Sequence, residues 1–419
     1  MGPSISIVVI AIRMISLSAV STTSPDESLD RSRLARLCAT TFLHFIGMGI
    51  YMSSLPLYVH FELGGSKAMV GIAVGAFFPA AVVLRPVIGT GLDSWGRRPF
   101  LLAATATATV ASGLFFLAGS VWIVVALRLL QGFAGAAYYT GAATVATDLG
   151  PQERRAEVIS LFSLFLYGGF AIGPAIGEWL VGLGGFSLVW ATALTVSAAS
   201  FLIALGLPET LVPTDERRTS RFGLSSRAVA PGLVLMCAAS GYTAITSFTP
   251  LYAREIGMSN SGGLYATFSV TILAIRILAR KLADRRGRLT IVMPGLAGAA
   301  VGLLLLAVLQ VPVAAYAGVA IYGIGFALLF PALMAFTADR VPESQRGSAL
   351  ATFTLFFDLG SGIGSYVVGT VAQSYGFGAG YGLPAFLCAG AFTALAVRTL
   401  LRQRPGRAPR RSSPASADP

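Results

Sequence analysis

The stretch "RPVIGTGLDSWGRRPF", residues 85–100, ends an apolar run with charged and turn-forming residues, and its pattern returns as "RILARKLADRRGR" at 276–288. The residues that match at an offset of 191 positions are Arg85 with Arg276, Asp93 with Asp284, Gly96 with Gly287, and Arg97 with Arg288. Charged residues are scarce in these apolar surroundings. Their agreement at one offset therefore predicts that the chain is an internal duplication.

The agreement continues beyond this pair of stretches. Further matches at the same offset are Gly132 with Gly323, Asp148 with Asp339, Gly169 with Gly360, Gly173 with Gly364, and Gly185 with Gly376. Matching positions in the two halves fall at corresponding ends of apolar segments. We therefore expect two halves of the same orientation, related by an axis along the membrane normal.

The composition is that of a membrane protein. Of the 419 residues, 55% are hydrophobic and 11% charged, whereas a soluble domain has about 25% charged residues. The net charge of +12 could suggest nucleic acid, but the basic residues flank apolar segments, which is the pattern that sets membrane orientation. Three cysteines, Cys38, Cys237 and Cys388, lie in apolar runs without metal-like spacing. We expect no nucleic acid, no cofactor and no metal.

Twelve apolar segments are long enough to cross about 30 Å of hydrocarbon as helices. They lie at 36–59, 70–90, 99–119, 121–145, 158–181, 187–207, 229–252, 263–283, 290–309, 313–337, 348–371 and 382–401. The sequence predicts an all-α membrane protein with twelve transmembrane helices in two pseudo-symmetric six-helix bundles.

Polar stretches divide the chain into five parts. Residues 35–207 and 229–402 are the expected bundles, and 208–228 form a polar, basic cytoplasmic linker. Residues 1–34 are expected to be a cytoplasmic extension, an over-long start of the chain or an interfacial segment. Residues 403–419 have the composition of a disordered basic tail that contacts lipid headgroups.

The loops that carry most of the arginines lie on one side of these segments, and only Lys67 and Arg254 stand out on the other. By the positive-inside rule, both termini are cytoplasmic. Arginine greatly outnumbers lysine, and alanine and glycine are abundant. This usage is typical of a GC-rich, bacterial genome, and we expect a multi-pass protein of the cell membrane.

Three motifs resemble those of a known family. They are "GTGLDSWGRR" at 89–98, "RLLQGFAGAA" at 128–137 and "GFAIGPAIG" at 169–177. On these residues the sequence resembles the major facilitator superfamily and, within it, is similar to the twelve-helix drug:proton antiporters. Ser94 stands where that family usually has a basic residue, and Glu178 where it usually has a glycine.

The first motif and its repeat predict a conformational latch at the cytoplasmic helix ends. Its expected residues are Gly89, Asp93, Gly96, Arg97, Arg98, Asp148, Asp284, Gly287 and Arg288. Carboxylates there can accept hydrogen bonds from a neighbouring helix N-terminus, while the arginines pair with acids such as Asp148 or Glu157. The resemblance implies that this latch opens in one conformation. Alternatively, the residues are solvated turns that set topology.

The third motif places Gly169, Gly173 and Gly177 four residues apart, so they form one smooth stripe along a helix. Pro174 lies beside the stripe, lacks a backbone donor and permits a bend. Close packing against another helix is expected in any case. The resemblance to exporters implies, in addition, a flexible contact between two helices that opens and closes.

Four ionisable residues inside or at the end of apolar segments are candidates for proton coupling: Asp358, His44, Glu178 and Arg128. Asp358 lies near mid-membrane, where a carboxyl that faces a cavity can load a proton on one side and release it on the other. A structural acid bonded to a neighbouring helix is the alternative. His44 could equally be a hydrogen-bonded core residue, Glu178 could face water, and Arg85 could reach the interface.

The sequence therefore predicts a proton-driven secondary transporter that exports a small, amphiphilic compound in exchange for protons. The resemblance implies a cavity between the bundles, and the candidate contacts are Gln131, Tyr138, Tyr139, Tyr242, Phe356 and Phe357. Proton symport of a sugar, metabolite or siderophore is the alternative. We expect a monomer in contact with lipid and no enzyme activity, since the two histidines have no partnered cysteine or metal-ligand cluster.

Overall fold

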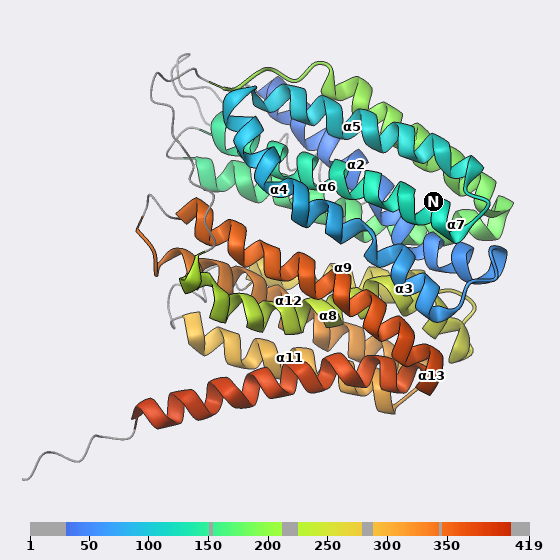
Figure 1. Cartoon of the computed structure of the whole chain (residues 1–419), viewed down its shortest axis with the longest axis vertical. Helices are drawn as coiled ribbons and strands as arrows, with labels where there is room; N and C mark the ends of the chain where they lie inside the picture. Colours follow the sequence, from blue (N-terminus) through green and yellow to red (C-terminus); the bar gives the residue numbers. More distant parts are fainter. Residues whose placement is uncertain (1–30, 151–153, 212–224, 279–287, 343–345, 404–419) are drawn as a thin grey trace, which may run out of the picture.

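The computed structural model describes residues 31–150, 154–211, 225–278, 288–342 and 346–403, which are nearly all helical (Figure 1). The first half contains α2 (Arg31–Leu57), the π-turn η1 (Tyr58–Glu62), α3 (Lys67–Gly75), α4 (Phe77–Ser94), α5 (Arg97–Leu114), the 3₁₀ turn η2 (Phe115–Leu117), α6 (Val121–Leu149) and α7 (Arg155–Ala204). The second half contains α8 (Ser226–Glu255), α9 (Gly262–Leu278), α11 (Arg288–Val308), α12 (Pro312–Ala338) and α13 (Arg346–Gln403). The fold is that of an all-α membrane protein.

Two helices are far longer than a bilayer requires, because each contains two helices joined at a glycine. In α7 the backbone leaves helical geometry at Gly184 and Gly185, and in α13 it does so at Gly376. Gly185 has φ 67° and Gly376 has φ 78°, a region that only glycine adopts easily. The sequence predicts loops at these two places. In the structure the chain instead turns within one or two residues. The turns lie at Gly185 and Gly376, which occupy matching positions in the internal repeat.

The segment predicted as one helix at 70–90 is broken in two. α3 is capped by the Ser66 side chain, which accepts a hydrogen bond from the Met69 backbone N–H at 3.2 Å. Between α3 and α4 the helix is interrupted at Ala76. Pro79 explains the break, since it cannot donate to the carbonyl four residues earlier and its ring crowds that turn.

Within the described ranges, nine helices are long and apolar enough to cross a membrane. They include both bent helices, each counted once, and α9 is a shorter apolar helix of 17 residues. Many large hydrophobic side chains lie on the outer surfaces of these helices. A soluble helical bundle of this size would expose less apolar surface.

Figure 1 shows the helices of the two halves as two groups lying side by side. Within each half, glycines allow two helices to pack backbone to backbone. In the first half, the glycines of α7 at 169, 173 and 177 pack on α2, and in the second, Gly360 and Gly364 of α13 pack on α8. These contacts follow the sequence repeat, so both halves use the same packing device.

The predicted part boundaries differ from the helix ends by a few residues. α2 begins at Arg31, inside the expected extension, and α8 begins at Ser226, inside the expected linker. Residues 1–30, the linker core at 212–224 and the tail at 404–419 lie outside the described residues. Asp284 and Gly287 of the predicted latch lie outside them as well, as does the side chain of Arg288.

Candidate functional site

A cavity of about 220 Å³ lies between the two halves and is lined mainly by aromatic and other apolar side chains. Its aromatic lining consists of Phe45, Tyr51, Phe77, Phe78, Tyr139, Tyr167, Phe170, Tyr242, Phe326, Phe330 and Phe357. Four charged residues also line it: Arg85, Arg128, Arg276 and Asp358. A largely apolar cavity with a few converging polar groups is typical of a small-molecule site.

Asp358 forms an ion pair across the two halves. Its Oδ2 lies 2.7 Å from Nη2 of Arg85, so α13 of one half is joined to α4 of the other. The Asp358 side chain is 5% exposed and that of Arg85 is 20% exposed. A pair removed this far from water depends on both partners, because the loss of either leaves an uncompensated buried charge.

Arg276 also lines the cavity and contacts an aromatic ring instead of an acid. Its guanidinium carbon is 4.0 Å from the centre of the Tyr167 ring, a contact between α9 and α7. Among the described residues, Arg276 forms no ion pair. The ring face attracts the cation but does not neutralise its charge.

Arg128 of α6 lines both the cavity and a smaller pocket of about 20 Å³, which has room for about one water molecule. Its Nη1 donates to Gln131 Oε1 at 2.8 Å, and its guanidinium lies 4.9 Å from the Phe77 ring centre. His44 lines the same small pocket and stacks on Tyr138 at 4.1 Å. His44 Nε2 has no hydrogen-bond partner in the part of the chain that the structure describes.

The six candidate substrate contacts fall in three places. Tyr139, Tyr242 and Phe357 line the large cavity, and Gln131 lines the small pocket. Tyr138 and Phe356 line neither. Tyr138 is fully buried behind His44, with its hydroxyl 3.1 Å from Thr41 Oγ1, and the Phe356 ring packs against Gly232 of α8.

Glu178, a candidate for proton coupling, does not line the cavity. It accepts hydrogen bonds from the backbone N–H and the hydroxyl of Ser261, at 2.7 and 2.6 Å. Ser261 directly precedes α9, so the carboxylate of α7 sits at the N-terminus of a helix in the other half. At the same end of the molecule Lys67 pairs with Glu255 at 2.8 Å, and Ser365 donates to the Gly71 carbonyl at 2.9 Å. These contacts close one end of the space between the halves.

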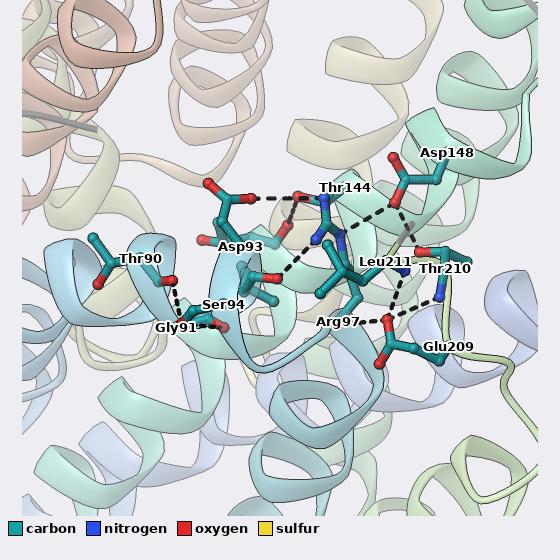
Figure 2. Close-up of polar contacts among 12 residues, drawn as sticks. Thr90, Gly91, Asp93, Ser94, Arg97, Thr144, Asp148, Glu209, Thr210 and Leu211 are labelled. Carbon is teal, nitrogen blue, oxygen red and sulfur yellow. Dashed lines mark hydrogen bonds and ion pairs between the residues drawn. The ribbon is translucent and has the colours of Figure 1, made fainter. Parts of the chain in front are cut away.

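Three residues of the predicted latch, Asp93, Arg97 and Asp148, meet at the other end (Figure 2). Arg97 pairs with Asp148 of α6 at 3.3 Å and with Asp93 of α4 at 3.6 Å. Gly96 has φ 105°, which turns the chain between α4 and α5. A side chain at Gly89 would meet no atom within 4 Å. The expected partner Glu157 pairs instead with Arg154, at 3.0 Å.

A carboxylate that no sequence motif predicts, Glu209, also contributes hydrogen bonds to the cluster around Arg97. Glu209, which follows α7, accepts a hydrogen bond from the backbone N–H of Arg97 at 2.9 Å (Figure 2). It accepts a second from the backbone N–H of Arg98 at 3.1 Å. It therefore caps α5, a role expected for the latch aspartates. Burial raises the pKa of Glu209, but four backbone N–H donors outweigh it and hold the pKa below its usual range.

Thr210 completes the cluster, because its hydroxyl donates to Asp148 at 2.7 Å. No repeat predicts Glu209, since Leu400 stands at the matching position of the second half. For Arg276 and Tyr167 a signal did exist. The offset of 191 that pairs Arg85 with Arg276 also pairs Tyr167 with Asp358, so once one contact is known, the repeat indicates the position of the other.

Comparisons with known proteins agree with this architecture. The model of the Major Facilitator Superfamily matches residues 37–365 and 264–419. An uncharacterized MFS-type transporter of Burkholderia mallei (strain SAVP1) is 29% identical over 403 residues, 93% of this chain and 97% of the relative.

Two solved structures are similar in fold. A bacterial homologue of the human lysosomal transporter Spinster, in an inward-facing and unoccupied conformation, has a TM-score of 0.74 and 16% identity, covering 91% of this chain and 100% of its own. The nucleoside transporter NupG has a TM-score of 0.70 and 17% identity, covering 87% and 98%.

Proposed function

Because the chain belongs to the major facilitator superfamily, we propose that it exports a small, amphiphilic compound in exchange for protons, by alternating access. Family and fold make it a multi-pass membrane transporter of a small molecule rather than an enzyme. In our proposal each of the two bent helices crosses the membrane twice and α9 crosses once, which gives twelve crossings. Both termini are then cytoplasmic, and the end that bears Lys67 faces outward.

The ion pair between Arg85 and Asp358 is the observation that supports proton coupling. It joins the two halves at the cavity wall, where alternating access requires them to move relative to each other. A proton on Asp358 removes one charge of the pair and so weakens the attraction between α4 and α13. Proton binding thereby favours one arrangement of the halves over the other.

The glycine stripe at 169, 173 and 177 supports export as the direction. Its motif resembles that of exporters, and in the structure the stripe lies against α2 at backbone distance. An aromatic cavity suits the apolar part of an amphiphilic cargo. Outward transport then requires the closed end, held by Glu178 and Ser261, to open.

Symport into the cell is a second candidate, and the charges of the cavity favour it. Three arginines face one carboxylate there. A cationic cargo competes with the proton for Asp358, so cargo and proton move in opposite directions, which is exchange. An anionic cargo binds better when a proton has neutralised Asp358, so cargo and proton move together, which is cotransport. The membrane potential can also drive export of an anion without any coupled proton. The driving free energy is then about 2.3 kcal/mol per charge moved for each 100 mV of potential.

The test is accumulation of fluorescent dyes and antibiotics in an efflux-deficient bacterial host that expresses the chain, with and without a protonophore. For export we expect lower accumulation, abolished by the protonophore. The variant Asp358→Asn should lose at least about tenfold of the gradient-driven transport, since the amide does not titrate. Glu157→Gln, which alters an exposed ion pair, is the matched control and should transport normally.

The double variant Arg85→Gln with Asp358→Asn separates coupling from folding. Asp358→Asn alone leaves the Arg85 charge buried, at a cost of about 3–5 kcal/mol, whereas the double variant removes both charges. We expect it to regain thermal stability but not gradient-driven transport. Full coupling in either variant, with normal expression, would remove Asp358 from the mechanism, and higher accumulation in the host would establish uptake.

A further inference from the structure

We propose that the cargo is an organic anion with an aromatic or other apolar body, and that Arg276 binds its negative group. The inference rests on the proposed transport function. By the coupling argument above, an anionic cargo fits cotransport with protons, or export driven by the membrane potential, better than exchange for protons. The negative group is a carboxylate, sulfonate or phosphate, the planar or branched oxyanions that a guanidinium binds through two parallel hydrogen bonds.

The internal repeat singles out Arg276. Arg85 and Arg276 match at the offset of 191 residues, and their partners Asp358 and Tyr167 match at the same offset. Both contacts join the two halves, and both lie on the cavity wall. The two halves thus present the same arginine, one neutralised by a carboxylate and the other only stacked on a ring.

The charge balance of the cavity leaves room for an anion. Three guanidinium groups and one carboxylate line it, and Asp358 is committed to Arg85. Neither Arg128, which is 8% exposed, nor Arg276 forms an ion pair with an acid among the residues that the structure describes. Uncompensated positive charge at membrane depth is costly, and an anionic ligand offsets that cost.

The geometry around Arg276 suits a bound anion. The Arg276 guanidinium lies over the Tyr167 ring, and no acid among the described residues pairs with its N–H groups, which can donate to a ligand. Arg276 Nε is buried and has no hydrogen-bond partner among the described residues. Rings of the cavity, including Tyr139 and Tyr242, provide the apolar walls for the body of the ligand.

The experiment measures binding to the purified full-length protein in detergent, by equilibrium dialysis of three probes of one size. The probes are 1-naphthoate, its neutral amide and 1-naphthylmethylammonium. We expect naphthoate to bind at least about tenfold more tightly than the amide, and the cation to bind most weakly. Transport is measured separately, so the two proposals can fail independently.

Variants then locate the anion site. Arg276→Gln should lower naphthoate affinity at least about tenfold and leave amide affinity unchanged, and Arg276→Lys should retain part of it. Tyr167→Asp supplies Arg276 with the acid that its counterpart Arg85 has, so naphthoate affinity should fall although the arginine remains. Tyr167→Phe keeps the ring and should bind as the unmodified protein does.

Arg254→Gln is the matched control, because Arg254 also lies over a ring, that of Phe61 at 4.8 Å, and does not line the cavity. Naphthoate affinity should not change in this variant. Equal affinity for naphthoate and its amide, or tightest binding of the cation, would overturn the anion proposal even if the chain transports dyes. Selective naphthoate binding that survives Arg276→Gln would overturn the assignment to Arg276.

Discussion

Single carboxylates have separate tasks in this molecule. Asp358 pairs with an arginine of the other half at the cavity, Glu178 meets a helix N-terminus across the halves, and Glu209 caps α5 within one half. The surroundings of each, and not its residue type, decide which task it has. Only the first of the three touches the proposed cargo site.

At the scale of one residue, we predict that Glu209→Gln destabilises the protein in a pH-dependent way. At pH 7 the free energy of unfolding should fall by about 0.5–1 kcal/mol, the contribution expected of a charged helix cap at an exposed position. The pKa of Glu209 is lower in the folded protein than the value of about 4.3 for an unfolded chain. Its contribution is therefore complete above that value and is lost as the pH falls below it.

Thermal unfolding in detergent between pH 6 and pH 3 checks this prediction. The difference in Tm between the unmodified protein and the variant should shrink towards the acid end. A difference that stays constant over this range would mean that the Glu209 charge does not stabilise α5. Glu157→Gln, at a second exposed acid, controls for a general effect of removing surface charge.

At the scale of the helices, glycine determines how closely two elements approach. α7 meets α2 with its backbone because three glycines face it, and the repeat produces the same contact between α13 and α8. Ser53 adds a hydrogen bond to the Pro174 carbonyl at 2.7 Å. In a bilayer such close packing replaces the hydrophobic effect as the source of helix association.

We predict that Gly173→Ala destabilises this packing by about 1–3 kcal/mol, a typical cost of overpacking. Its added methyl group would lie 2.6 Å from the Ile46 carbonyl oxygen and 2.7 Å from Gly49 Cα, so the backbones must separate. Gly182→Ala is the matched control on the same helix, since nothing lies within 4 Å of its new methyl group. It should keep or raise the Tm, because alanine favours the helix. Equal changes in both variants would contradict the packing argument.

At the scale of the whole molecule, the halves touch along one end and leave a cavity behind it. The closing contacts include the ion pair of Lys67 with Glu255 and the bonds of Ser261 with Glu178. The Arg97 cluster, in contrast, joins elements of one half only. Alternating access in our proposal therefore breaks the first set of contacts.

We predict that a reducible cross-link between Lys67→Cys and Glu255→Cys stops transport, with recovery on addition of a reductant. The Lys67 ammonium and the Glu255 carboxylate meet at 2.8 Å across the halves. Cysteine side chains are shorter, so the link uses a bifunctional thiol reagent with an internal disulfide, and it keeps that end closed. The background replaces the native cysteines at 38, 237 and 388 by serine. A link between Arg154→Cys and Glu157→Cys, which lie in one half, should leave transport intact. Transport that continues through the first link would contradict the proposed motion.

The sequence by itself determined the membrane character, the duplication and the superfamily resemblance. These follow from apolar length, from scarce charges at a fixed offset and from local motifs, all of which are properties of neighbouring residues. It also identified Arg85, Arg128 and Asp358 as intramembrane charges. It placed breaks around Gly185 and Gly376 but did not determine that each turn takes only one or two residues, because the conformation of a glycine is not restricted by its own side chain.

Only the tertiary structure decided which charges meet. Arg85 and Asp358 are 273 residues apart, and their pairing depends on how α4 and α13 pack. The same holds for Glu209 at the start of α5, and for Tyr167 under Arg276. A sequence records which ionisable groups enter the membrane, whereas their partners depend on distances between helices. Those distances arise from the packing of the whole molecule, which no local pattern contains.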